Sequence, residues 1–124
     1  MELIGAINRV DSLKPNTYSQ NDKLQWLSEL DLRVKTQIMD LYEGNGAANF
    51  TGYTDKTPVN TVLLVPAPFD EMYLRWLEAK IDYYNNENDR YNNAMALFAE
   101  LFDAFAKHYA RGRRACGTGQ RFLF

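Results

Sequence analysis

Residues 68–111 decide the fold: they read PFDEMYLRWLEAKIDYYNNENDRYNNAMALFAELFDAFAKHYAR. In the second half of this stretch, large apolar residues recur at steps of three or four, the spacing that places side chains on one face of an α-helix. They are Tyr91, Met95, Phe98, Phe102, Phe105 and Tyr109. The first half carries a matching stripe of Tyr73 or Leu74, then Leu77, Ile81 and Tyr84. Both stripes must be buried, so we expect two helices packed as an antiparallel hairpin around an Asn-rich turn at 85–88.

Two further helices are expected upstream. Residues 2–13 form a short amphipathic pattern that ends before Pro15, because the residue preceding a proline is disfavoured in helical conformation. Ser19, followed by Asp22 three residues later, is typical of a helix N-cap. That helix is predicted to run to about residue 43, with Gly44 as its stop. The sequence therefore predicts an all-α chain, a four-helix antiparallel bundle or hairpin.

Residues 44–65 break the helical pattern with closely spaced Gly, Asn, Thr and Pro residues. Two short extended pieces, 49–53 and 61–65, are predicted to pair as a small β-hairpin, although two strands alone are marginal in water. A loop of this length inside a compact domain is often functional. We therefore expect residues 1–111 to form one helical domain from which the 44–65 loop protrudes as a contact arm, with Phe50 and Tyr53 as contact residues.

Residues 112–124 differ in composition from the helices, with three glycines, a basic cluster and an apolar end. We expect this C-terminal tail to be flexible or to be ordered by a partner. Arg113 and Arg114 suit an acidic protein surface better than nucleic acid, because the basic run is short. Phe122 and Phe124 either belong to a loose end or insert into a neighbouring molecule.

Composition limits the function classes. The net charge is −2 and charged residues make up 24% of the chain, so there is no general basic excess for nucleic acid or anionic membranes. Aromatic residues make up 14%, and tyrosine and tryptophan favour protein interfaces, which makes Trp26 and Trp76 further candidate contact residues. The single cysteine, Cys116, rules out an internal disulfide and a cysteine-built zinc site. The first ten residues lack a signal-peptide pattern and no apolar run approaches 20 residues, so we expect a cytosolic product without a membrane segment.

The sequence gives little support for catalysis. The only histidine, His108, falls in the last turns of the fourth predicted helix, where it favours the helix dipole. No HExxH, CxxC, GxSxG or phosphate-loop pattern occurs. Asp82, Glu100 and Asp103 are interpreted as residues of solvated helix faces. We therefore expect no catalytic residues, no cofactor and no metal.

Several segments in order resemble the small helical head-tail connector proteins of tailed bacteriophages, also called head-completion or adaptor proteins. They are 6–11 (AINRVD), 13–16 (LKPN), 23–31 (KLQWLSELD), 50–53 (FTGY), 63–70 (LLVPAPFD), 73–79 (YLRWLEA) and 91–98 (YNNAMALF). The resemblance covers roughly residues 6–110 and leaves out the tail.

This resemblance implies a non-enzymatic virion protein of the neck, made in the host cytoplasm and placed between capsid and tail. Its subunits would form a closed ring of about a dozen copies that binds the portal protein on one side and a tail or stopper protein on the other. DNA would pass through the ring without specific binding. A ring needs two different adhesive surfaces on each subunit. The alternative is a small helical DNA-binding or regulatory phage protein, which a salt-dependent shift of DNA in a gel would reveal.

Overall fold

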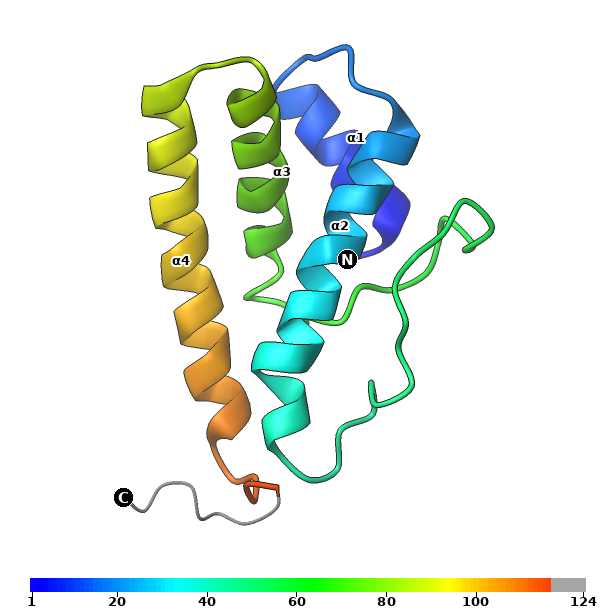
Figure 1. The fold of residues 1–124 in the computed structure, drawn as a ribbon, viewed down its shortest axis with the longest axis vertical. Helices are drawn as coiled ribbons and strands as arrows, with labels where there is room; N and C mark the ends of the chain where they lie inside the picture. Colours follow the sequence, from blue (N-terminus) through cyan, green and yellow to red (C-terminus); the bar gives the residue numbers. More distant parts are fainter. Residues whose placement is uncertain (117–124) are drawn as a thin grey trace.

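The computed structural model describes residues 1–116, which form four packed α-helices (Figure 1). The helices are α1 (Leu3–Leu13), α2 (Gln20–Gln37), α3 (Glu71–Tyr84) and α4 (Asn88–Ala110). A short 3-10 helix, η1 (Met39–Leu41), follows α2. Within residues 1–116 there is no β-strand, only two isolated antiparallel bridges. The predicted all-α fold is confirmed, and no helix of the described part is long and apolar enough to cross a membrane.

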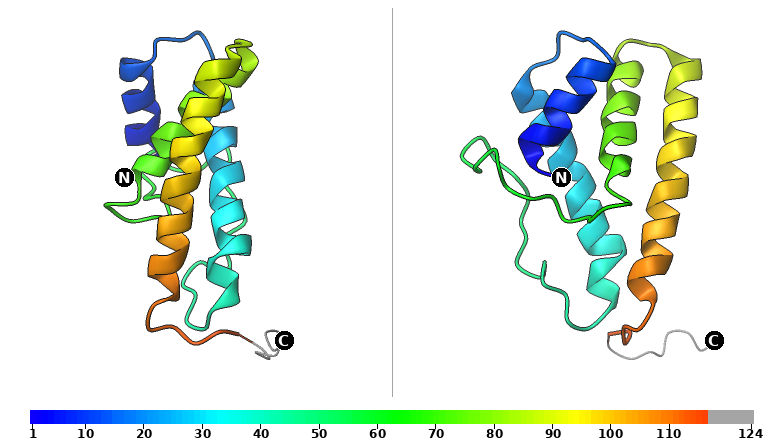
Figure 2. Two further views of the ribbon diagram at one scale, coloured as in Figure 1. Left: turned by 90° about the vertical axis from the view of Figure 1, so that its left-hand side faces the viewer. Right: turned by 180° about the vertical axis from the view of Figure 1, so that it is seen from behind.

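The α3–α4 hairpin is the largest helix pair of the fold, and its predicted turn is confirmed. Asn86 has φ of 61°, a left-handed conformation that asparagine tolerates better than most residues. The Asn85 amide donates to the Ile81 carbonyl and closes the end of α3. Figure 2 shows α4 at the edge of the bundle, beside α3. Most of the predicted stripe residues are buried: Tyr73, Leu77, Ile81, Phe98, Phe105 and Tyr109. Tyr91, Met95 and Phe102 are half-buried, and the prediction is wrong for Tyr84, which is 52% exposed at the end of α3.

Helix α2 begins where the sequence predicts, since the Ser19 hydroxyl accepts a hydrogen bond from the Asp22 amide at 3.0 Å. It ends at Gln37, about six residues earlier than predicted. Ile38 leaves helical geometry, and the chain tightens into η1 before Tyr42 becomes extended. The extended backbone at Tyr42 pairs with Ala115, a contact between distant segments that local helix propensity does not anticipate.

The loop between η1 and α3 does not contain the predicted β-hairpin, so that prediction is wrong. Instead of pairing with one another, the loop segments bond to the N-terminus of the chain. The first free amides of α1, those of Leu3 and Ile4, donate to the Thr61 and Val59 carbonyls, both at 2.9 Å. A helix start leaves such amides without partners inside the helix, so the loop serves as its backbone cap. Leu63 also donates to the Met1 carbonyl.

The C-terminal segment is attached to the body as far as the structure describes it. The Glu43 amide donates to the Arg114 carbonyl at 2.8 Å, and the Cys116 amide donates to the Leu41 carbonyl at 2.7 Å. The first residues of the predicted tail therefore bond to the segment after η1. Phe122 and Phe124 lie outside the described residues, so the predictions for them stay predictions.

Candidate partner-binding site

A closed polar centre fixes the 44–65 loop to the helices. Asp31, on α2, is fully buried and accepts three hydrogen bonds. They come from the Tyr53 hydroxyl, from the Tyr73 hydroxyl at 2.6 Å and from the Leu64 amide at 3.1 Å. The Tyr73 hydroxyl in turn accepts from the Val65 amide at 2.8 Å. One carboxylate thus joins α2, α3, the middle of the loop and its C-terminal end.

The electrostatics of this centre follow from burial. Loss of water raises the pKa of Asp31, while the hydrogen bonds from Tyr53, Tyr73 and Leu64 act in the opposite direction. Burial and the neighbouring carboxylate both raise the pKa of the Tyr53 and Tyr73 hydroxyls, so both remain protonated donors at neutral pH. Asp31 lines none of four surface clefts on the described residues. We therefore assign this centre a structural role.

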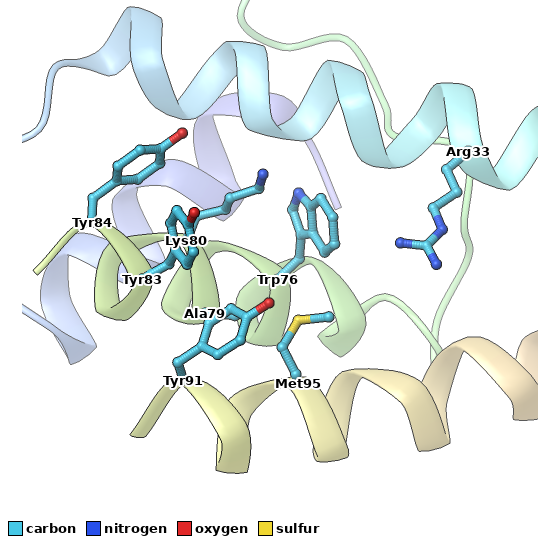
Figure 3. A pocket seen from close by; sticks show the side chains of 8 residues that line it. All are labelled: Arg33, Trp76, Ala79, Lys80, Tyr83, Tyr84, Tyr91 and Met95. Atoms are coloured by element: carbon cyan, nitrogen blue, oxygen red, sulfur yellow. The ribbon is translucent and has the colours of Figure 1, made fainter. Parts of the chain in front are cut away.

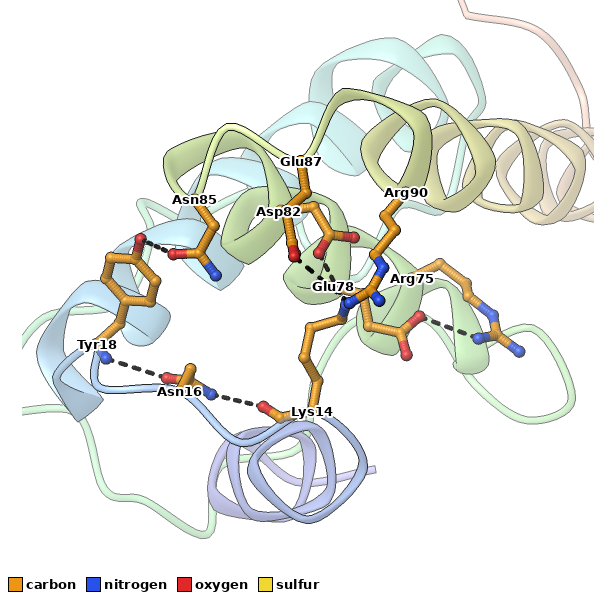
Figure 4. A network of polar contacts seen from close by, with 9 residues as sticks. All are labelled: Lys14, Asn16, Tyr18, Arg75, Glu78, Asp82, Asn85, Glu87 and Arg90. Carbon is orange, nitrogen blue, oxygen red and sulfur yellow. Dashed lines mark hydrogen bonds and ion pairs between the residues drawn. The ribbon is translucent and has the colours of Figure 1, made fainter.

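A second buried carboxylate holds the upper corner of the bundle (Figure 4). The Asp82 side chain is 2% exposed and pairs with the Lys14 ammonium at 2.7 Å. Nearby, the Tyr18 hydroxyl donates to the Asn85 side chain at 2.6 Å, which links the α1–α2 connection to the end of α3. The prediction that Asp82 lies on a solvated face is wrong. Its side chain points from α3 toward Lys14, which directly follows α1, and is buried in this ion pair (Figure 4).

Above this corner, aromatic rings form a continuous cluster that reaches the surface. Trp26 and Tyr84 stack with an interplanar angle of 11° and a centroid distance of 5.6 Å. Tyr18 meets the Trp26 ring edge-on at 5.6 Å. Tyr83 continues the cluster to Tyr84 at 5.2 Å and to Tyr91 at 5.6 Å. Tyr83 and Tyr84 are 59% and 52% exposed, so large apolar rings face solvent here.

This cluster forms one wall of the largest cleft among those found on the described residues, with a volume of about 430 Å³ (Figure 3). We call it the aromatic cleft. It opens between α2, α3 and α4, and half of its lining residues are aromatic, two are cationic and none is acidic. The lining residues are Arg33, Trp76, Ala79, Lys80, Tyr83, Tyr84, Tyr91 and Met95.

The two cations of the aromatic cleft are held on aromatic faces. The Lys80 ammonium lies 4.9 Å from the centre of the Trp76 ring, and the Arg33 guanidinium lies 5.5 Å from the centre of the Phe102 ring. Lys80 also approaches Glu29, a 57% exposed residue, at 3.5 Å. Within residues 1–116, Arg33 forms no ion pair and donates only a long hydrogen bond to Gln37. The cleft therefore offers aromatic rings, their polar groups and excess positive charge, which fits an acidic protein surface that also carries some apolar groups.

The structure places three predicted contact residues inside the protein. Trp26 and Trp76 are 7% exposed, and Tyr53 is 5% exposed. The Trp76 indole N–H donates to the Trp26 carbonyl at 2.7 Å, which ties α3 to α2. The half-buried Phe50 packs edge-on against Tyr53 at 4.9 Å. Trp26, Trp76 and Tyr53 are therefore core residues, and Phe50 packs against the core. Their role at an interface stays a prediction.

The predicted basic residues lie at the other end of the fold. Arg113 stacks its guanidinium 3.8 Å from the Tyr109 ring centre and donates to the Tyr109 carbonyl at 2.8 Å. Arg114 is exposed, and its carbonyl is bonded to Glu43. His108 lies in the last turn of α4 as predicted, with its ring against Phe69 at 4.9 Å. Over the described part of the chain, no group of three or more His, Cys, Asp or Glu residues is placed to hold a metal ion.

Sequence reasoning missed Asp31 and Lys80. Asp31 follows Leu30 and precedes Leu32 in an otherwise ordinary amphipathic helix, and only the tertiary position of Tyr53 and Tyr73 makes it the centre of a network. The sequence does not distinguish Lys80 from an ordinary surface lysine, whereas in the structure it lines the aromatic cleft. Comparisons of the chain with protein-family profiles, curated protein sequences and solved structures find no match.

Proposed function

We propose that this protein is a structural subunit of the neck of a tailed bacteriophage, assembled head-to-tail into a ring that joins the portal to the tail. The observation that carries the proposal is the aromatic cleft, in which exposed tyrosines and two cations surround the largely buried Trp76 on a helical frame. Such surfaces are typical of protein contacts, where aromatic residues and arginine contribute most of the binding energy.

The positions of the resembling segments support the same function. The segment 23–31 supplies Trp26 and Asp31, and the segment 50–53 supplies the tyrosine that bonds to Asp31. The segment 73–79 supplies Tyr73 to the same network and Trp76 to the cleft. Thus the segments behind the connector resemblance supply the residues that fix the loop and four of the eight residues that line the cleft.

The internal rigidity of the loop also suits a structural subunit. Asp31 and the N-terminus of α1 hold the loop at Tyr53 and along residues 59–64, so the side chains exposed there stand on a backbone that is bonded to the helices. Within it, Val59 and Val62 are 47% and 66% exposed, which gives a second apolar surface apart from the aromatic cleft. A connector needs several separate contact surfaces, for its own copies and for the components above and below.

Light scattering tests this function. The purified chain is measured alone and after mixing with the portal protein of its own phage. The proposal predicts a discrete assembly of several copies, either in the chain alone or after the portal is added. A chain that remains a monomer in both samples, and that does not co-elute with the portal, contradicts it.

A further inference from the structure

Helix α4 carries a second exposed surface, on nearly the opposite side from the aromatic cleft. Leu97, Glu100 and Ala104 follow one another at steps of three and four, so they share one side of the helix. We call these three residues the α4 ridge. Leu97 is 44% exposed, and Glu100 and Ala104 are also exposed. Tyr91 and Met95, which line the cleft, lie on the other flank of the same helix.

The α4 ridge is complementary in charge to the cleft. Glu100 forms no ion pair within residues 1–116, whereas the neighbouring Asp103 is paired with Lys107 at 3.0 Å. The ridge therefore presents an acidic group beside an exposed leucine. The cleft presents the opposite arrangement, aromatic rings with Arg33 at one end, and Arg33 forms no ion pair within residues 1–116 (Figure 3).

We propose that the α4 ridge of one copy docks into the aromatic cleft of the next copy, with Leu97 against the aromatic rings and Glu100 facing Arg33. This proposal rests on the ring function proposed above and names the two surfaces that form its repeated contact. The two surfaces differ and lie on opposite flanks of α4, so each copy can give one and receive one. That is the condition for a head-to-tail contact, which closes into a ring when the rotation between copies allows it.

The volume of the cleft is consistent with this occupant. A space of about 430 Å³ accepts a few side chains from a helix, as helix-in-groove contacts do when residues at steps of three and four enter a hydrophobic groove. Ala104 and the neighbouring Ala96 are small, which lets the helix backbone approach the rim. An ion pair formed at this place would be partly shielded from water by the surrounding rings, which strengthens its contribution relative to an open surface pair.

Charge reversal tests the pairing. Arg33→Glu and Glu100→Arg are made singly and together, and assembly is measured by sedimentation over a range of concentrations under conditions in which the wild type assembles. Each single reversal is expected to weaken assembly about tenfold or more, because like charges then face one another. The double variant restores the opposite charges in exchanged positions and is expected to recover assembly to within about threefold of wild type.

Matched controls separate the contact from net charge and from folding. Arg9→Glu and Glu43→Arg make the same changes in charge at exposed sites outside both surfaces and are expected to assemble like wild type. Leu97→Asp places a second charge on the ridge and is expected to block assembly. The circular dichroism spectrum of the monomer is expected to stay unchanged, which would show that the helices still fold.

The outcomes distinguish the two proposals. If the wild type assembles but the single reversals do not weaken assembly, or the double variant is no better than the singles, the pairing of ridge and cleft is overturned and the ring remains. If the wild type does not assemble with or without the portal, the proposed function is overturned and the pairing with it.

Discussion

Asp31 offers the sharpest test of how the loop is held. Asp31→Ala removes the acceptor for two tyrosine hydroxyls and one backbone amide, all in a region that water does not reach. A buried donor left without a partner costs roughly 1–3 kcal/mol, and Asp31→Ala leaves three donors without this acceptor. We therefore expect the free energy of unfolding to fall by about 3–5 kcal/mol, with a fall of roughly 10–20 °C in Tm.

Urea titration followed by circular dichroism and tryptophan fluorescence measures this effect. The matched control is Glu29→Ala on the same helix, a 57% exposed residue whose one ion pair within residues 1–116 is long, and a change within about 0.5 kcal/mol is expected. Substituting each of the two tyrosines that donate to Asp31 tests the relative strength of their contributions to stability. Tyr73→Phe is expected to cost more than Tyr53→Phe, because only Tyr73 also accepts from a backbone amide, that of Val65. If Asp31→Ala lost less than about 1 kcal/mol, the network would not hold the loop.

The sign of the pH dependence follows from the same burial. Burial raises the pKa of Asp31 above its usual value of 3.8, so the folded protein binds this proton more tightly than the unfolded chain does. The stabilisation from protonating Asp31 is fully present below the pKa that Asp31 has in the unfolded chain. It is lost as pH rises through the higher pKa that Asp31 has in the folded protein. The stability gap between wild type and Asp31→Ala is therefore expected to be wider at about pH 4 than at about pH 7. A gap that narrows on acidification would show that the hydrogen bonds outweigh burial.

Two further predictions concern the packing around the site. Lys14→Met leaves the buried Asp82 carboxylate without its cation and should lower the free energy of unfolding by about 2–4 kcal/mol in urea titration; an unchanged midpoint would mean that Asp82 is solvated. Gly52→Ala should cost about 2 kcal/mol or more, because Gly52 has φ of 105° and an added Cβ would meet the Ser28 hydroxyl at 2.7 Å. Gly46→Ala, where an added Cβ meets nothing within 4 Å, is its control and should change thermal stability little; equal effects of the two substitutions would contradict the close approach of the loop to α2.

The helices could be predicted because their signals are local. The stripe from Phe98 to Tyr109 has helical spacing, Ser19 has the chemistry of an N-cap, and the asparagines at 85 and 86 suit a tight turn. Each of these features depends on residues within a few positions of one another, so the sequence order reveals it directly.

The loop and the cleft could not be predicted because their partners are distant in sequence. Residues 61–65 have strand-like composition, yet their backbone bonds go to Met1, Leu3 and the side chains of Asp31 and Tyr73. Asp31 and Tyr53 are 22 residues apart, and only the folded chain brings them together. The cleft likewise joins Arg33 of α2 to Met95 of α4, which no local pattern links.

The central claim is that this chain is built to assemble around an axis and connect other proteins. Electron microscopy of the purified chain bound to the portal of its own phage tests that claim most directly. The account predicts class averages with a closed ring of repeated helical subunits, coaxial with the portal and open in the middle. Averages that show the portal alone, or isolated single subunits at irregular positions, would contradict it.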